Sequence, residues 1–239
     1  MKNIIQCENI VKRYKDFSLK SISFTLEAGY LTGLIGVNGA GKTTLINILA
    51  GLDTDFKGKI NINGINIKKN PVEVKQEIGL VSEKLSFFMD NTAFENGVLL
   101  GGYFKNWSME NYYIWLDKMN VPKDQPLYQF SKGMKMKFQI SFAMAHSPKF
   151  LFLDEPTAGF DPVFRKDFLN MLQDILNKDI GILMSTHITS DLDKIADYII
   201  LLENGEIKIN DTKEVLEDNS KRKQVEDSLN KKFHISDLL

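Results

Sequence analysis

The sequence has almost no cysteine and no excess of basic residues, and these two absences exclude several classes of protein. The 239-residue chain has one cysteine, Cys7, so it cannot form an internal disulfide and fits a reducing compartment. We expect Cys7 to be a small, buried apolar residue within a strand. The 30 basic residues do not exceed the 31 acidic ones, and the net charge of -1 argues against a general nucleic-acid-binding protein. We therefore expect no nucleic-acid partner.

The sequence also lacks an apolar run that would act as a leader or a membrane span. The first fifteen residues have no extended apolar segment and no cleavage site of small residues. Residues 28–52 carry a single charge, at Lys42, but five glycines within fourteen residues of this stretch would not make a stable spanning helix. We expect a buried strand, a glycine loop and a helix there, in a chain that is soluble by itself.

Strand and helix patterns alternate through most of the chain. Polar and apolar residues alternate over the first thirty positions, whereas residues 31–36 and 150–155 are short apolar runs typical of strands buried on both faces. Alternation of this kind predicts an α/β fold with a mainly parallel sheet and an antiparallel N-terminal β sub-domain. The other expected elements are strands at 78–83 and 181–186, helices at 43–49, 162–176 and 190–195, and hairpins that turn at Asn63–Gly64 and Asn204–Gly205.

The stretch 84–146 differs, because aromatic residues are frequent and helical spacings dominate. We expect an inserted α-helical sub-domain, flanked by a core built from residues 1–83 and 147–215. Residues 216–239 carry charges of both signs and predict a C-terminal helical tail. The aromatic residues of the insert are expected to pack internally rather than to stack on bases: Phe87, Phe88, Phe94, Tyr103, Phe104, Trp107, Tyr112, Tyr113 and Trp115.

The strongest local signal is a phosphate loop. Residues 36–43 match G-x-x-x-x-G-K-[ST] without error and lie between an apolar strand and a helix. Glycines let backbone N–H groups turn toward phosphate oxygens, and the helix start adds unpaired donors and a positive dipole end. Lys42 supplies a charge for the β- and γ-phosphates, and Thr43 a hydroxyl for Mg²⁺. The residues expected to hold the nucleotide are Asn38, Gly39, Ala40, Gly41, Lys42, Thr43 and Thr44.

Two carboxylates stand at the end of the predicted strand 150–155, after four apolar residues. Asp154 ends the strand, and in phosphate-loop folds an aspartate in this place holds Mg²⁺. Glu155 comes next, and because the strand is ending, its side chain can turn toward the γ-phosphate. A second carboxylate there suits a general base or a residue that positions the attacking water.

Three further motifs occur in an order and at intervals that resemble those of one protein family. Residues 131–134 read Ser-Lys-Gly-Met before a predicted helix, Asp161 ends an Ala-Gly-Phe-Asp motif, and His187 ends a Ser-Thr-His motif after a strand. With the phosphate loop and the paired carboxylates, they make the chain resemble the ATP-binding subunit of an ABC transporter over about residues 2–215. The resemblance implies a P-loop NTPase core that binds ATP with Mg²⁺ and hydrolyses it to ADP and phosphate.

The resemblance also implies roles for single residues. Residues 131–134 resemble the ABC signature, Asp161 the D-loop aspartate and His187 the switch histidine that contacts the γ-phosphate. Tyr14 stands where the family places an aromatic residue that stacks on adenine. The two other histidines have no such context, and we expect no role for them: His146 and His234.

Two such domains are implied to face each other head to tail. Each ATP would lie between the phosphate loop of one domain and Ser131, Lys132, Gly133 and Asp161 of the other. A homodimer is preferred, with a heterodimer as the alternative. Closure around ATP and opening after hydrolysis would drive a transmembrane permease, which would hold the chain at the cytoplasmic face of the cell membrane.

The sequence departs from the family pattern at two positions. Lys132 replaces the first of two glycines that usually follow the signature serine, and it would place a positive charge near the γ-phosphate of the partner. Glu83 replaces a glutamine that contacts Mg²⁺ and the attacking water, so it would add a negative charge beside Asp154 and Glu155. Both departures resemble those of bacterial exporters with a separate short membrane subunit, which handle peptides, antibiotics or similar amphipathic compounds.

Two other functions stay open. One is a soluble ABC-type ATPase without a membrane partner, in an assembly or scaffold role. The other is an ATP-dependent binding module that does not hydrolyse ATP, although the presence of Lys42, Glu155 and His187 argues against it. The sequence does not indicate the transported substrate.

Overall fold

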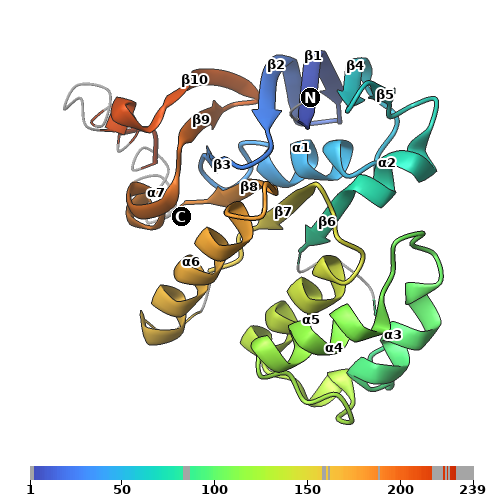
Figure 1. Cartoon of the computed structure of the whole chain (residues 1–239). Coiled ribbons are helices and arrows are strands. Elements are labelled where there is room, and N and C mark those ends of the chain that lie inside the picture. The colour runs from blue at the N-terminus through green and yellow to red at the C-terminus, as the bar shows by residue number, and fades with distance from the viewer. Residues whose placement is uncertain are drawn as a thin grey trace.

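The structure is a computed structural model that describes residues 3–82, 87–157, 160, 162–187 and 189–216, together with residues 223, 225 and 227–229. Two lobes are visible in Figure 1. The core lobe contains two β-sheets and the helices packed on them, and the helical lobe consists of residues 87–146. Among the described residues, no helix combines the length and the apolar character needed to cross a membrane.

The first sheet is antiparallel and has the strand order β2-β1-β4-β5. Its strands are β1 (Ile4–Arg13), β2 (Ser18–Glu27), β4 (Lys57–Ile62) and β5 (Ile65–Asn66). The turn between β4 and β5 has positive φ angles of 51° at Asn63 and 80° at Gly64, as a tight hairpin requires. Cys7 is buried in β1 as predicted, and burial raises the pKa of its thiol, so the thiolate is disfavoured.

The second sheet has the order β10-β9-β3-β8-β7-β6, with every neighbouring pair parallel except β10 and β9. The predicted mainly parallel α/β fold is confirmed. Every residue of β3, β7 and β8 is buried, which explains their apolar sequences. The strands are β3 (Leu31–Ile35), β6 (Ile78–Val81), β7 (Phe150–Asp154), β8 (Gly181–Thr186), β9 (Tyr198–Glu203) and β10 (Glu206–Thr212).

Helix α1 (Lys42–Leu49) lies between the two sheets (Figure 1). Leu45 and Ile46 are fully buried in a cluster that also contains Phe150 and Phe152 of β7. The alternate β7 residues belong to the other core cluster, with side chains of α6 (Pro162–Leu176) and α7 (Thr189–Ile195). Burial of each such apolar side chain contributes about 1.5–3 kcal/mol, so α1 is fixed between the layers by its apolar faces.

One helix of the core lobe was not predicted from the sequence. Helix α2 (Pro71–Glu77) has seven residues and begins with a proline in its first turn. Val74 is its only fully buried residue. A single buried position produces no repeat of apolar residues at helical spacing, so the sequence pattern did not predict α2.

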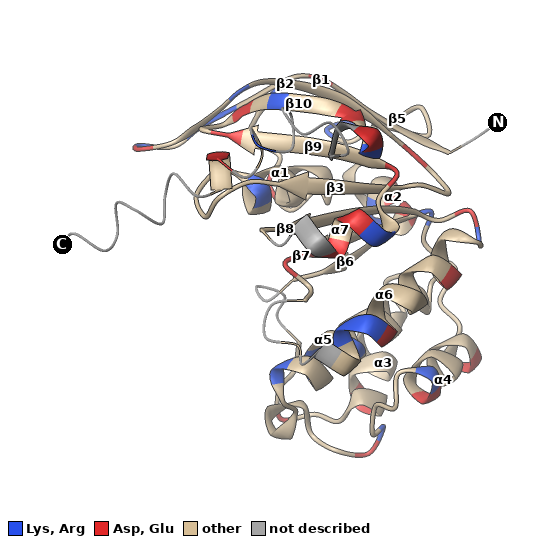
Figure 2. Cartoon of the chain, turned by 90° about the vertical axis from the view of Figure 1, so that its left-hand side faces the viewer, with Lys and Arg blue, Asp and Glu red and all other residues tan. Residues whose placement is uncertain are grey.

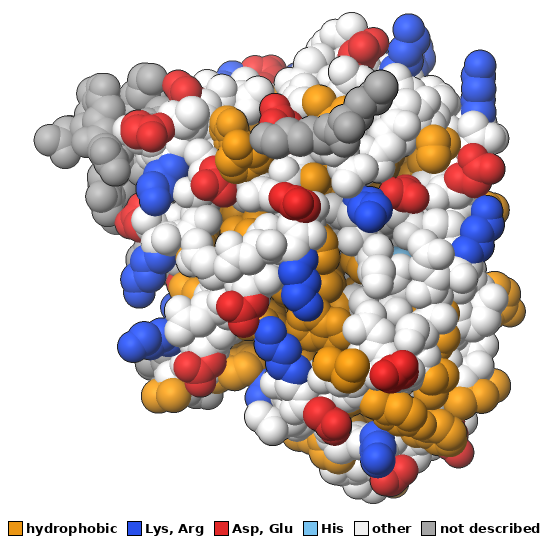
Figure 3. Space-filling view, viewed as in Figure 1, with side chains coloured by type: hydrophobic (Ala, Val, Ile, Leu, Met, Phe, Trp, Pro, Cys, Tyr) orange, Lys and Arg blue, Asp and Glu red, His pale blue; other side chains and the backbone are white. Residues whose placement is uncertain are grey.

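The helical lobe contains α3 (Ala93–Gly101), α4 (Met109–Lys118), a 3₁₀ turn (Leu127–Gln129) and α5 (Lys132–Met144). Tyr112 and Trp115 are buried, as expected for aromatic residues that pack. The expectation was wrong for Phe88 and Tyr103, which are 50% and 78% exposed, whereas the 38%-exposed Phe94 stacks on Tyr113 with ring centroids 6.4 Å apart. Figure 3 shows hydrophobic side chains gathered on this face over α3, where Val98 and Leu99 are also exposed.

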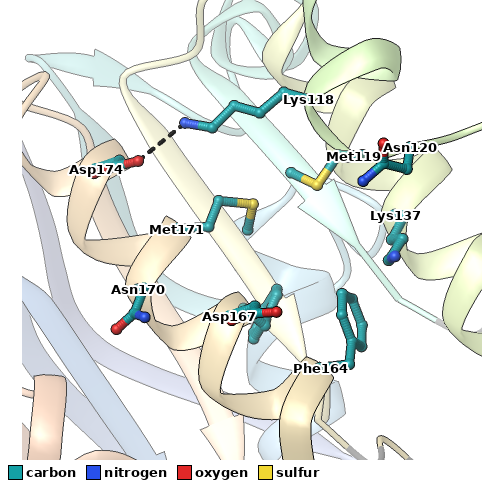
Figure 4. Close-up of a pocket in the computed structure, with 10 residues that line it drawn as sticks. Lys118, Met119, Asn120, Lys137, Phe164, Asp167, Asn170, Met171 and Asp174 are labelled. Atoms are coloured by element: carbon teal, nitrogen blue, oxygen red, sulfur yellow. Dashed lines mark hydrogen bonds and ion pairs between the residues drawn. The ribbon is translucent and has the colours of Figure 1, made fainter.

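The core lobe and the helical lobe are connected by a hydrogen bond on one side of α5 and by an ion pair on the other. The side-chain oxygen of Gln139 accepts a 2.9 Å hydrogen bond from the buried backbone N–H of Ser82, at the end of β6. On the other side, a cavity of about 370 Å³ separates α4 and α5 from α6, and Lys118 reaches across it to Asp174 at 3.1 Å (Figure 4). Both charges are partly exposed, so this ion pair contributes at most about 1 kcal/mol.

Acidic and basic residues are interspersed along the ribbon of both lobes in Figure 2, in agreement with the near-zero net charge. The chain after β10 begins with a 3₁₀ turn (Lys213–Leu216). Most of the predicted C-terminal tail, 216–239, lies outside the described residues.

Acid should destabilise the fold through His146, which is 2% exposed. Burial lowers the pKa of His146 to about 4, against 6.5 for an exposed histidine, although its hydrogen bond to Ile78 opposes the shift. As the pH falls from about 6.5 to 4, the unfolded chain binds a proton that the folded chain does not. The free energy of unfolding should therefore fall by up to about 3 kcal/mol over this range and level off below it.

Urea denaturation of the unaltered chain and of His146→Phe at pH 7 and pH 4.5 measures this effect. The loss of stability between the two pH values should be smaller in His146→Phe, which keeps an aromatic ring but cannot titrate. Equal losses in the two proteins would contradict the prediction.

Candidate functional site

The phosphate loop leaves the end of β3 and requires glycine at two positions for steric reasons. A Cβ on Gly36 would lie 2.4 Å from the carbonyl oxygen of Leu202. Gly41 has a φ of +110°, and a Cβ there would lie 2.5 Å from Cζ of Phe17. Any other residue at these two positions would clash or be strained, so the glycines of the sequence pattern are explained by the shape of the loop.

The loop leads into the N-terminus of α1 and encloses a pocket of about 290 Å³. The cap residue, Gly41, has no side chain that could bond to the first N–H groups of the helix, so these donors can bind a ligand. With the dipole of α1, they make the pocket suited to phosphate. Its lining residues are Phe17, Val37, Asn38, Gly39, Gly41, Lys42, Thr43, Thr44 and Glu155.

Lys42 and Glu155 form an ion pair inside this pocket. The Nζ atom of Lys42 is 3.1 Å from Oε1 of Glu155 and donates a 2.6 Å hydrogen bond to the carbonyl oxygen of Gly36. Lys42 is 6% exposed, so its ammonium group is largely shielded from water. A bound phosphate would compete with Glu155 for this ammonium group.

Asp154 and Ser185 connect the ends of β7 and β8 below the loop. One carboxylate oxygen of Asp154 accepts a 2.8 Å hydrogen bond from the hydroxyl of Thr43, and the other accepts one of 2.7 Å from Ser185. The hydroxyl of Ser185 also accepts a 2.9 Å hydrogen bond from the backbone N–H of Glu155. Ser185, to which the sequence gave no role, therefore positions both carboxylate residues.

The side chain of Glu155 turns back toward the loop because its backbone is left-handed, with a φ of 50°. Its second carboxylate oxygen lies 2.9 Å from Nδ1 of His187, at the end of β8. The structure thus brings together Lys42, Asp154, Glu155 and His187, four of the residues selected from the sequence.

The donor set agrees with the Mg²⁺ expected from the sequence. Among the described residues, no cluster of three or more His, Cys, Asp or Glu side chains could hold a metal ion. Mg²⁺ in nucleotide sites needs only one or two protein oxygens, with phosphate and water as its other ligands. The hydroxyl of Thr43 and the carboxylate of Asp154, which lie in contact, supply two such oxygens.

The aromatic residue that lines the phosphate pocket is Phe17, whereas Tyr14 reaches the loop only through Thr44. Phe17 lines the pocket, whereas Tyr14 is 50% exposed, and the two rings stack with centroids 6.5 Å apart. The hydroxyl of Tyr14 donates a 3.1 Å hydrogen bond to Asp53; partial burial and this bond raise the pKa of Tyr14. The sequence indicated one aromatic residue here and missed the second, although Phe17 stands three positions away.

The signature residues lie outside the phosphate pocket, at the start of α5 in the helical lobe. Ser131 caps α5 by accepting a 3.2 Å hydrogen bond from the N–H of Met134, and both Ser131 and Lys132 are exposed. A Cβ on Gly133 would meet no atom closer than 3.9 Å, so this glycine is not required by its own chain. The other two selected residues, Glu83 and Asp161, lie outside the described residues.

Removal of the Ser185 hydroxyl should slow hydrolysis without preventing nucleotide binding. Ser185→Ala releases the backbone of Glu155 and leaves one oxygen of the buried Asp154 unpaired, at a cost of about 1–3 kcal/mol. We expect kcat to fall about tenfold and KM for ATP to change less than threefold. Ser141→Ala is a matched control, because Ser141 is equally buried and, among the described residues, bonds to the carbonyl oxygens of Trp115 and Lys137, away from the phosphate loop. An equal loss of kcat in both variants would contradict a positioning role for Ser185.

Comparison with known proteins agrees with this geometry. A family model described as ABC transporter matches residues 19–158. The chain is 33% identical over 213 residues to the linearmycin resistance ATP-binding protein LnrL of Bacillus subtilis (strain 168), covering 85% of this chain and 68% of LnrL. It is 32% identical over 213 residues to the bacitracin transport ATP-binding protein BcrA of Bacillus licheniformis, covering 87% of this chain and 69% of BcrA.

A solved structure described as the ATP-binding subunit of an ABC transporter matches the fold with a TM-score of 0.83. The two chains are 25% identical, and the match covers 95% of this chain and 99% of the other. The chain therefore belongs to the ABC transporter family, as an ATP-binding and ATP-hydrolysing subunit with a P-loop NTPase fold.

Proposed function

We propose that the chain powers a bacterial exporter of peptides, antibiotics or similar amphipathic compounds by ATP-driven dimerisation. The proposal is supported by relatives named for linearmycin resistance and bacitracin transport. The main support for dimerisation is that the phosphate-binding residues and the signature residues lie apart within one chain. Lys42 and Glu155 line one pocket and Asp154 bonds to Thr43 of that pocket, whereas Ser131 and Lys132 are exposed outside it.

Each residue at the phosphate pocket has a distinct role in this proposal. Lys42 and the N–H groups of residues 38–44 bind the phosphates, and the hydroxyl of Thr43 and the carboxylate of Asp154 hold Mg²⁺, which neutralises phosphate charge when bound. Glu155 accepts the proton of the attacking water. His187, 2.9 Å from Glu155, orients that carboxylate and contacts the γ-phosphate. Phe17 and Tyr14 form the aromatic surface for adenine.

The signature residues act on the nucleotide of a second subunit. At the start of α5, Ser131 presents a hydroxyl, and the first N–H groups of the helix carry the positive end of its dipole. Lys132 adds a positive charge to the same exposed surface, and Asp161 lies in the segment that would meet the partner. ATP would thus be held between two subunits, and hydrolysis would remove the contact. An identical chain is the preferred partner.

The membrane partner is a permease subunit, which holds the chain at the cytoplasmic face of the membrane. The surface that contacts the permease is on the helical lobe. Exposed apolar side chains on α3, Val98 and Leu99, support this position, because apolar surface of this kind is common where proteins associate.

The mass of Glu155→Gln in solution, with and without Mg-ATP, tests the dimer. We expect a monomer that becomes a dimer when Mg-ATP is added, because a carboxamide in place of the carboxylate cannot complete hydrolysis and the contact through ATP persists. Ser131→Ala combined with Glu155→Gln should bind ATP but dimerise less. A protein that binds ATP and stays monomeric with or without Ser131 would contradict a homodimer built from these residues.

A further inference from the structure

Tyr14 lies beside the phosphate pocket, in the segment that connects β1 to β2. Its backbone N–H donates a 2.8 Å hydrogen bond to the carbonyl oxygen of Phe17, which closes this turn. Tyr14 is 50% exposed, and its ring centroid is 6.5 Å from that of Phe17, which lines the pocket. A nucleotide whose phosphates occupy the pocket can therefore extend its base toward Tyr14.

An exposed aromatic ring in a turn is a poor stacking surface unless something fixes it. Side chains of this kind exchange between rotamers, and a base that stacks on the ring must first select one of them. The immobilisation of one such side chain lowers affinity by about threefold to tenfold. A contact that fixes the ring before the nucleotide binds removes most of this cost.

The hydroxyl end of Tyr14 has such contacts. It donates a 3.1 Å hydrogen bond to Oδ2 of Asp53, which follows α1 in the chain and whose own N–H bonds to the carbonyl oxygen of Asn47 in α1 at 3.3 Å. The side chain of Thr44, in the first turn of α1 and in the wall of the pocket, also interacts with that of Tyr14. The ring is thus connected to the helix that follows the phosphate loop.

Asp53 can hold the tyrosine because its own carboxylate is fixed. Oδ1 accepts hydrogen bonds of 3.0 Å from Nζ of Lys12 and 3.0 Å from the backbone N–H of Asp55, and Oδ2 lies 2.9 Å from the same Nζ atom. Partial burial disfavours the charge of Asp53, but the hydrogen bonds from Lys12, Asp55 and Tyr14 lower its pKa. The group is therefore an ionised acceptor at neutral pH.

Lys12 acts on both Asp53 and the tyrosine ring. It is 7% exposed, and its ammonium group lies 5.3 Å from the ring centroid of Tyr14, within the range of a cation–π contact. Asp55 lies 3.2 Å from the same ammonium group and supplies a second negative charge. The need to neutralise Lys12 therefore does not account for the bond between Tyr14 and Asp53.

We propose that Asp53, fixed by Lys12, is a positioning residue for the nucleotide base, because it holds the ring of Tyr14 in the orientation on which the base stacks. The inference rests on the proposed function for the role of Tyr14 at adenine. Asp53 acts through Tyr14 and not on the phosphates. Loss of the bond between the two residues should therefore weaken the binding of a nucleotide and leave the binding of a phosphate chain unchanged.

Titration of the full chain with ADP, and displacement of ADP by pyrophosphate, separates these two effects. Both compounds carry two linked phosphates, but only ADP has a base. Neither has a γ-phosphate, so hydrolysis and ATP-driven dimerisation do not enter the measurement. The variants are Tyr14→Phe, which keeps the ring and loses the hydroxyl, Asp53→Ala, and the two combined. Asp55→Ala is the matched control, because it removes the other carboxylate beside Lys12.

We expect Tyr14→Phe and Asp53→Ala each to weaken ADP binding by about threefold to tenfold, and the combined variant to be no weaker than the single ones. Pyrophosphate affinity should change less than twofold in all of them. Asp53→Asn, which keeps an oxygen for the tyrosine hydroxyl, should recover part of the ADP affinity. Asp55→Ala should bind ADP as the unaltered chain does, and Tyr14→Ala, which removes the ring itself, should bind it more weakly than Tyr14→Phe.

Three results would overturn the proposal: unchanged ADP affinity in Tyr14→Phe and Asp53→Ala, losses that add in the combined variant, or an equal loss of pyrophosphate affinity. Tyr14→Phe alters an exposed residue, so its result stands even if Asp53→Ala does not fold. If Tyr14→Ala also leaves ADP affinity unchanged, the proposed role of Tyr14 at adenine fails as well. If only Tyr14→Ala weakens ADP binding, that role holds and the positioning by Asp53 alone is wrong.

Discussion

Replacement of Glu155 by glutamine should lower ATP turnover by about 10²–10⁴ while ATP binds more tightly than before. The first effect follows from the chemistry of the side chain. A carboxylate positioned at the γ-phosphate can accept the proton of water, and a carboxamide of the same shape cannot. Because Glu155 is held by its backbone bond to Ser185, the substituted side chain should occupy the same place.

The second effect follows from the ion pair in the phosphate pocket. In the structure, Oε1 of Glu155 lies 3.1 Å from Nζ of Lys42, so a phosphate that binds this ammonium group must displace the carboxylate. Glutamine removes this competition and one negative charge near the phosphates. Glu155 is 25% exposed, so solvent screens the pair, and we expect a gain in affinity of about threefold to tenfold.

Isothermal titration with ATP and a steady-state phosphate-release assay measure the two effects separately. Glu77→Gln is the control, because Glu77 is also half-buried and accepts a hydrogen bond from Asn63, away from the phosphate loop. The control should match the unaltered chain in both measurements. Retained turnover in Glu155→Gln would show that another group takes the proton, and unchanged affinity would show that the ion pair does not oppose binding.

The sequence predicted those parts of the site that depend on a continuous segment. Within the loop 36–43, Gly41 has a φ of +110° that favours glycine, and Asp154 ends a strand whose apolar residues reveal its burial on both faces. Features made by distant segments were not foreseen. Ser185 acquires its function from hydrogen bonds to residues about thirty positions away, and Phe17 from its contact with Gly41.

His146 shows the same limit within the fold. In the sequence it is one histidine near the end of a helical segment, with no motif around it. In the structure it is buried between two lobes because α5 packs against β6 and brings it to the carbonyl oxygen of Ile78, 68 positions earlier. Which polar side chains become buried, and which of their atoms remain unpaired, is decided by such packing between distant segments.

Replacement of Lys42 by alanine should weaken ATP binding by about 10- to 150-fold, since a hydrogen bond to a charged group contributes about 1.5–3 kcal/mol. Lys42 is the only cationic residue among those that line the described phosphate pocket. Its loss leaves the negative charge of Glu155 facing the phosphates without compensation. Lys20→Ala, which breaks an exposed ion pair with Glu206, is the control and should bind ATP normally.

The size of this loss should depend on residue 155. In the unaltered chain, Lys42 gives up its contact with Glu155 when it gains the phosphate, so part of its interaction with ATP is offset. In Glu155→Gln there is no such contact to give up, and Lys42→Ala should therefore cost more. We expect the loss of affinity to be about threefold to tenfold larger in the Glu155→Gln background, which is the coupling that a double-mutant cycle isolates. Equal losses in the two backgrounds would mean that Lys42 and Glu155 are not paired in solution, and that the pocket is open to phosphate without the release of either side chain.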